Sequence, residues 1–168
     1  MLAEYKYIDD EPIEPAKPIA SVRFQSDYDI TDILTRWGNW ARKEAYLQQK
    51  NFSLYKSEQE QFKESCSDDD GLLIDSMITA LGKMKTQKSQ DEYHVLKLYY
   101  FGEIRMLDDT VMIVTQSLRG IAKITGINKD NVKSLKESGE SCIIGMLAMQ
   151  TMLTGVELEL LQNIRLLK

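Results

Sequence analysis

Residues 117–136 read SLRGIAKITGINKDNVKSLK, a pattern typical of two helices joined by a glycine turn. Gly126 fits the turn, because glycine adopts a positive φ without steric cost. Four further positions carry the small and apolar residue types that the corner requires: Ala122, Ile127, Val132 and Leu135. One position does not fit, since Thr125 stands where an apolar residue is usual.

The second helix of this corner is expected to begin at Asn128, a residue type that often caps helices. Its outward positions are polar or basic, as in a helix-turn-helix that binds DNA: Lys129, Asn131, Lys133, Ser134 and Lys136. An ordinary corner of two helices follows the same pattern. The residues leave both interpretations open, and we prefer the DNA-binding one.

The composition is that of a globular protein of a reducing cytoplasm. The chain has 168 residues, of which 43% are hydrophobic and 28% charged. No run approaches the roughly 18 consecutive apolar residues of a membrane span, and the acidic N-terminus does not resemble a signal peptide. Two cysteines are too few for a disulfide framework, and a single histidine without a CxxC pair argues against a zinc site. We expect no membrane association, metal or cofactor.

Positive charge gathers at the predicted corner. Residues 118–136 hold five bases and one acid, a local charge of +4 that leaves −9 for the remainder of a chain with net charge −5. An acidic protein does not coat nucleic acid without sequence preference. A basic patch on an acidic body instead indicates one site for DNA phosphates and other surfaces for proteins.

The N-terminal residues differ from the rest of the chain. Residues 1–26 hold all three prolines and show no helical period, so we expect an extended arm before a single helical domain at 27–168. That domain is expected to be all-α, opening at Ser26 or Asp29 with an apolar stripe that contains Trp37 and Trp40 as core anchors. Three bases of this first helix are candidates for added phosphate contacts: Arg36, Arg42 and Lys43.

The string SCSDDDGLLID at 65–75 allows two interpretations. Asp68, Asp69 and Asp70 are either metal ligands or acid catalysts, or they lie in the first turn of a helix capped by Ser67 or Asp68. The calcium-loop pattern fails, because with Gly71 as the turn glycine Cys66 falls at the first ligand position. We therefore favour the helix start over a metal-dependent enzyme.

The remaining segments are expected to be mostly helical. Ser89–Glu92 matches a capping box for a helix that reaches Tyr100. The apolar run within 105–116 fits either a strand or a buried helical turn. After Lys136 the helix continues, with Gly139 and Gly145 permitting close contacts, and residues 154–157 match a second capping box. The apolar stripe of the last helix, 156–167, suits either intramolecular packing or a dimer contact.

Five strings occur in an order that resembles the late-gene antiterminator Q proteins of lambdoid bacteriophages, in the branch without a zinc finger. These are WGNW at 37–40, CSDDDGLLID at 66–75, EYHVLKLYYFGEI at 92–104, SLRGIAK at 117–123 and ESCIIGMLAM at 140–149. The resemblance runs from about residue 29 to 150. The corner itself is also similar to the promoter-reading domain of bacterial sigma factors, through the pattern GIxxxxV that begins at Gly126.

The resemblance implies a regulator that is not an enzyme and acts in the cytoplasm of a bacterial host. Such proteins bind a DNA element at a phage late promoter, load onto paused RNA polymerase and make it read through pauses and terminators. The partners implied are double-stranded DNA and host RNA polymerase, with self-association on DNA as a possibility. The residues that correspond to the family's DNA-contacting unit are Arg119, Lys123, Asn128, Lys129, Asn131, Lys133, Ser134 and Lys136. The alternative is a dimeric helix-turn-helix transcription factor that acts only at the promoter.

Overall fold

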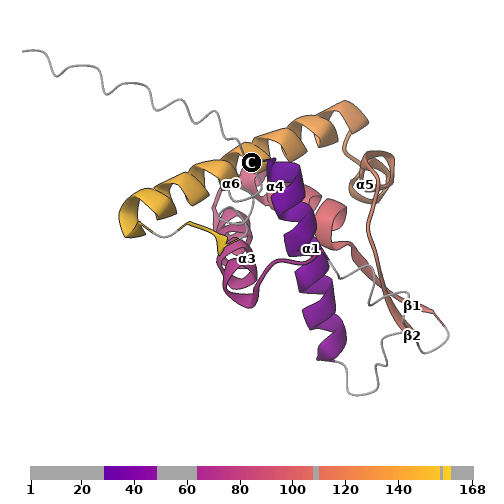
Figure 1. Ribbon diagram of the computed structural model, residues 1–168. Helices are drawn as coiled ribbons and strands as arrows, with labels where there is room; N and C mark the ends of the chain where they lie inside the picture. Colours follow the sequence, from indigo (N-terminus) through magenta and orange to yellow (C-terminus); the bar gives the residue numbers. More distant parts are fainter. Residues whose placement is uncertain (1–28, 49–63, 108–109, 156, 160–168) are drawn as a thin grey trace, which may run out of the picture.

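The first helices begin where the sequence offers a capping side chain. The computed structural model describes residues 29–48, 64–107, 110–155 and 157–159 (Figure 1). The Asp29 carboxylate accepts a hydrogen bond from the Thr31 amide at 2.9 Å and caps α1 (Ile30–Leu47). Ser67 caps α3 (Asp68–Lys83) and leaves three aspartates in its first turn. Both predicted helix starts are confirmed.

The next helix begins earlier than the sequence predicted. The Thr86 hydroxyl accepts a hydrogen bond from the Ser89 amide at 3.2 Å and caps α4 (Gln87–Leu96). The predicted capping box at Ser89–Glu92 is therefore wrong. The helix continues into a π-helical turn, η1 (Lys97–Phe101), which closes where the Gly102 amide donates to the Lys97 carbonyl at 2.8 Å.

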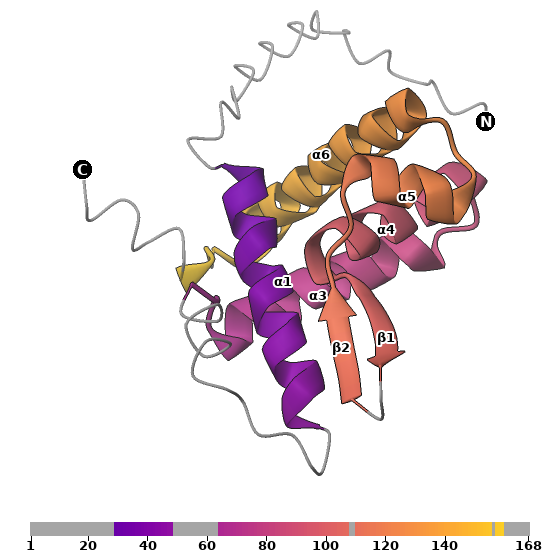
Figure 2. The ribbon, with the colours of Figure 1, turned by 90° about the vertical axis from the view of Figure 1, so that its right-hand side faces the viewer.

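Residues 103–114 form an antiparallel hairpin of β1 (Glu103–Leu107) and β2 (Thr110–Val114), with Ile104 opposite Ile113. The expectation of an all-α fold is wrong at this point, because the apolar run forms a strand and not a helical turn. Tyr46 of α1 holds the hairpin through its hydroxyl, which accepts a hydrogen bond from the Ile113 amide at 2.9 Å. The hairpin extends away from the helical body, on the side opposite α6 (Figures 1 and 2).

Two apolar clusters form the core. The larger one joins α1, α3, η1 and α6, and includes Trp37, Trp40, Ile74, Leu81 and Ile143. Both tryptophans are thus core anchors, as predicted. The smaller cluster lies beneath the last two helices and centres on the fully buried Val95, Ile121 and Val132. The long helix α6 (Lys129–Thr154) takes part in both clusters and packs along α4.

Glycines mark where helices approach one another closely. A Cβ at Gly139 of α6 would lie 2.9 Å from Leu96 Cδ1, so the predicted close contact is confirmed there. At Gly145, no described residue beyond the neighbouring backbone of α6 lies within 4 Å of such a Cβ, so the same prediction is wrong there. No helix in the described part of the chain is long and apolar enough to cross a membrane.

The end of α6 differs from its prediction. Thr154 is the last residue of α6 and Gly155 its C-cap, with φ 69°, so residues 154–157 are not the predicted capping box. The chain then returns to the body, where Leu158 is buried in the larger cluster. The predicted arm at 1–26 and all but three residues of the predicted last helix lie outside the described residues.

Candidate nucleic-acid interface

The two-helix corner is built from side chains that satisfy the backbone at each helix end. Ser117 caps α5 (Leu118–Thr125) by accepting a hydrogen bond from the Gly120 amide at 3.1 Å. Gly126 ends α5 with φ 72°, and its amide donates to the Ala122 carbonyl at 3.0 Å. Asn128 caps α6 by accepting from the Asp130 amide at 2.8 Å. The turn glycine and the cap are therefore where the sequence predicted them.

Thr125, the residue that did not fit the pattern, takes part in the turn through its hydroxyl. This hydroxyl donates to the Ile121 carbonyl at 2.8 Å and accepts from the Ile127 amide at 3.3 Å. Because Ile127 is the first residue past the glycine, the hydroxyl links both sides of the turn. A local hydrogen-bond pair thus replaces the apolar contact usual at this position.

The inner face of the corner is apolar, as predicted. Val132 is fully buried, and the other three predicted inner residues pack around the same cluster: Ala122, Ile127 and Leu135. Contacts with α4 and η1 complete this cluster. The inner face of the corner therefore packs against α4 and η1 of the helical body (Figure 2), and the exposed side chains of α5, the turn and the first turns of α6 form its outer edge.

Most of the candidate DNA-contacting residues lie on that outer edge. Seven of the eight are exposed: Arg119, Lys123, Asn128, Lys129, Asn131, Lys133 and Ser134. Lys133 lies 3.8 Å from Glu137 across one turn of α6, a distance at which an exposed ion pair is weak. The Asn128 side chain already caps the helix, so it is partly engaged. The seven candidates are thus exposed side chains of α5, the turn and the first two turns of α6.

Lys136 is the exception, and the expectation that it points outward is wrong. Its ammonium group donates to the Glu140 carboxylate and lies 4.8 Å from the centre of the Tyr99 ring. Only 13% of the Lys136 side chain and 9% of the Glu140 side chain are exposed. The helical period places Lys136 at the edge of the outer face, and the tyrosines beneath it draw it inward.

Glu140 is the centre of a buried polar cluster that the sequence analysis did not identify. Its carboxylate accepts hydrogen bonds from both the Lys136 ammonium and the Tyr100 hydroxyl. Burial and the neighbouring carboxylate raise the pKa of Tyr100, so its hydroxyl keeps its proton and donates. The sequence does contain an indication of the ion pair, since Lys136 and Glu140 are spaced i, i+4 on one helix. The cluster fixes α6 against η1.

Arg42 of α1 does not contribute a phosphate contact. Its guanidinium donates to the carbonyl oxygens of Tyr100 and Phe101, the latter at 3.1 Å, and to the Asn39 side chain. Burial lowers its pKa. The prediction for Arg42 is wrong because the carbonyls at the end of η1 lack hydrogen-bond donors within the helix, and the Arg42 guanidinium donates to them instead. The prediction for Lys43 stays a prediction.

The three aspartates of α3 diverge and do not gather around a common point. Asp68 accepts a hydrogen bond from the Trp40 indole at 3.0 Å, Asp70 accepts one from the Glu159 amide at 3.0 Å, and Asp69 is exposed. In the part of the chain that the structure describes, no three histidine, cysteine or acidic side chains are grouped to hold a metal ion. Asp68 and Asp70 therefore connect α3 to α1 and to the residues that follow α6.

The string that contains these aspartates packs directly against the string WGNW of α1. A Cβ at Gly71 would lie 2.3 Å from the Trp40 ring, so only glycine leaves room for that indole. Beside it, burial and the nearby Asp70 carboxylate raise the pKa of the Cys66 thiol to about 11. A protonated, buried thiol is a poor nucleophile, which makes Cys66 a packing residue.

These features define a small, mostly helical protein in which a two-helix corner presents a polar and basic edge. A family model described as phage antitermination protein Q matches residues 27–154. Because this match covers about three quarters of the chain, the protein belongs to the phage antitermination protein Q family, and the resemblance seen in the sequence is confirmed. No curated protein and no solved structure matches it. The similarity of the corner to the sigma-factor domain stays a prediction.

Proposed function

We propose that this chain binds double-stranded DNA through α5 and α6 at a phage late promoter, loads onto paused RNA polymerase and makes it read through pauses and terminators. Membership of the phage antitermination family supports the antitermination activity. The observation that carries the DNA-binding part is the exposed basic edge of the corner. Four exposed bases lie there, on a chain whose net charge is negative: Arg119, Lys123, Lys129 and Lys133.

The residues of the corner have different tasks in the proposal. Asn131 and Lys133 lie in the first turns of α6, the part of a recognition helix that reaches base edges. The exposed bases of α5 hold the helix on the phosphates, which position a protein without reading sequence. Lys136 has a third task, because its buried ion pair with Glu140 orients α6 and leaves it no free contact to DNA.

Replacing Asn131 or Lys133 by alanine is expected to weaken binding to the DNA element by about 1–3 kcal/mol if the residue contacts a base. A lysine that contacts only phosphate would instead reduce the salt slope by about one unit. Mobility shifts over a range of salt concentrations measure both effects. Arg105→Ala is the control, since it removes one charge from the hairpin, away from α6. Unchanged affinity in both variants would show that the recognition helix is placed incorrectly.

Transcription on a template with a late promoter followed by a terminator tests the antitermination activity. We expect readthrough to depend on this protein and to fall in the Asn131 and Lys133 variants. An effect confined to initiation, with termination unchanged, would favour the dimeric promoter-bound factor. The segment assigned to the dimer contact in that alternative, 156–167, lies mostly outside the described residues.

A further inference from the structure

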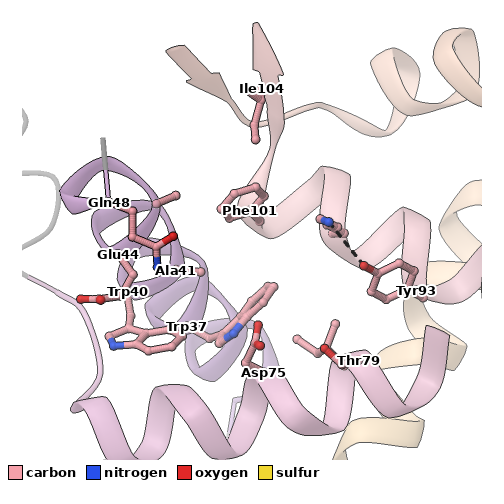
Figure 3. A pocket seen from close by; sticks show the side chains of 13 residues that line it. Trp37, Trp40, Ala41, Glu44, Gln48, Asp75, Thr79, Tyr93, Phe101 and Ile104 are labelled. Carbon is pink, nitrogen blue, oxygen red and sulfur yellow. Dashed lines mark hydrogen bonds between the residues drawn. The ribbon is translucent and has the colours of Figure 1, made fainter. Parts of the chain in front are cut away.

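A pocket of about 370 Å³ lies between α1, α3, α4, η1 and β1, and no described residue of α5 or α6 lines it. Four of its thirteen lining residues are aromatic, with Trp37 and Trp40 on α1 facing Tyr93 and Phe101 across the opening (Figure 3). Glu44 and Asp75 add two carboxylates to the lining. Aromatic faces beside carboxylates form the kind of surface that attracts a cationic group with an apolar stem.

Two carboxylates and one indole N–H of this pocket lack hydrogen-bond partners among the described residues. Among the described residues, neither the Glu44 nor the Asp75 carboxylate makes a hydrogen bond or ion pair with another side chain. The buried indole N–H of Trp37 has no acceptor either, and its ring forms part of the pocket wall. A buried donor without a partner is uncommon in folded proteins. Within the described part of the chain, the pocket thus offers two free carboxylate acceptors, whereas the Trp37 N–H is buried behind its wall and out of reach of a ligand.

The one base in the lining does not neutralise these carboxylates. Lys97 donates a hydrogen bond to the Tyr93 hydroxyl at 3.3 Å. Its ammonium group lies 5.6 Å from the centre of the Tyr93 ring and 6.0 Å from that of Phe101. The positive charge of Lys97 therefore lies beside the rings of Tyr93 and Phe101. A cationic group of a ligand would have to approach from the side of the two carboxylates.

The pocket continues onto an exposed apolar surface of the hairpin. Ile104 lines the pocket, yet 59% of it is exposed. Met106 lies two residues further along β1 and so on the same face, with 72% exposed. An apolar surface next to a pocket suits a polypeptide better than a small amine, because a chain covers both at once.

We propose that this pocket is a docking site for a segment of a partner protein that carries an arginine or lysine next to an apolar residue. The basic side chain enters between the aromatic rings and pairs with Asp75 and Glu44. The apolar residue of the segment covers Ile104 and Met106. The inference does not depend on the DNA interface, because the two surfaces share no residue.

Intrinsic fluorescence tests this site directly, since both tryptophans of the chain lie in the pocket. The full chain is titrated with the peptide acetyl-Leu-Arg-Leu-amide, and in parallel with the same peptide carrying citrulline, a neutral isostere of arginine. We expect a saturable change with the arginine peptide in the millimolar range and binding about tenfold weaker with citrulline. No saturable change, or equal responses to the two peptides, would overturn the proposal.

Two variants of the chain distinguish the pocket from other surfaces. Asp75→Asn is expected to weaken binding of the arginine peptide about tenfold, whereas Asp69→Asn, the same change at an exposed position of the same helix, leaves it unaltered. Ala45→Leu fills the pocket with a good helix former and is expected to reduce binding as much as Asp75→Asn. Circular dichroism confirms that each variant is folded. Full binding by Ala45→Leu, or equal effects of the two aspartate changes, would refute the assignment.

Discussion

Replacing Glu140 by alanine is expected to lower the free energy of unfolding by about 3–5 kcal/mol. The carboxylate accepts hydrogen bonds from the Lys136 ammonium and the Tyr100 hydroxyl, and all three side chains are largely buried. Alanine would leave a buried charge without a counterion and a buried hydroxyl without an acceptor. Each of these groups is hydrated in the unfolded chain, so the loss falls entirely on the folded state.

Urea unfolding followed by circular dichroism measures this change, with Glu137→Ala as the matched control. Glu137 lies on the same helix and forms an exposed ion pair with Lys133 at 3.8 Å, so its loss is expected to cost less than about 1 kcal/mol. Equal effects of the two substitutions would show that Glu140 is not paired as described.

A variant that replaces all three side chains by apolar ones distinguishes two contributions to the free energy of unfolding. One is the net stabilisation by the buried ion pair, and the other is the penalty for leaving one of its charges unpaired. The substitutions are Glu140→Leu, Lys136→Met and Tyr100→Phe together. Apolar replacement of a buried ion pair is often neutral or stabilising, so we expect this variant to recover most of the loss. If it were as unstable as Glu140→Ala, packing rather than the unpaired charge would explain the loss.

The local parts of the fold were readable from the sequence. Gly126, Asn128 and the apolar residues around them follow from offsets within 20 residues, because a turn and two short helices impose their own residue types. The same holds for Ser67, whose cap depends only on the next few residues. The features predicted correctly are those whose physical causes lie close together along the chain.

The features that the sequence could not provide depend on distant contacts. The apolar run of β2 fits a strand or a helix equally well in the sequence. The hydrogen bond from the Ile113 amide to the Tyr46 hydroxyl of α1 is one of the distant contacts that favour the strand. Lys136 is drawn inward by rings from η1, and Arg42 is used by carbonyls of the same turn. The proposed docking pocket draws on five elements, and no single segment of sequence shows its pattern.

Replacing Gly38 by alanine is expected to destabilise the protein by about 3 kcal/mol, although alanine favours helices more than glycine does. The added Cβ would lie 2.2 Å from the carbonyl oxygen of Tyr100 and 2.8 Å from its carbon. Neither atom belongs to a flexible side chain, so α1 and η1 must move apart. That movement also strains the hydrogen bonds from Arg42 to the same turn.

Gly145→Ala provides the matched control, because it is the same change within a helix where no described residue beyond the neighbouring helix backbone lies within 4 Å of the new Cβ. It is expected to raise the free energy of unfolding by about 0.5–1 kcal/mol through helix propensity alone. Urea unfolding of both variants measures the difference in free energy of unfolding, provided that the dependence of this free energy on urea concentration has a similar slope in both. Effects of opposite sign would assign the cost at Gly38 to the close approach of α1 and η1. A stabilised Gly38→Ala variant would instead mean that the two elements are further apart than described, and that Arg42 does not support η1.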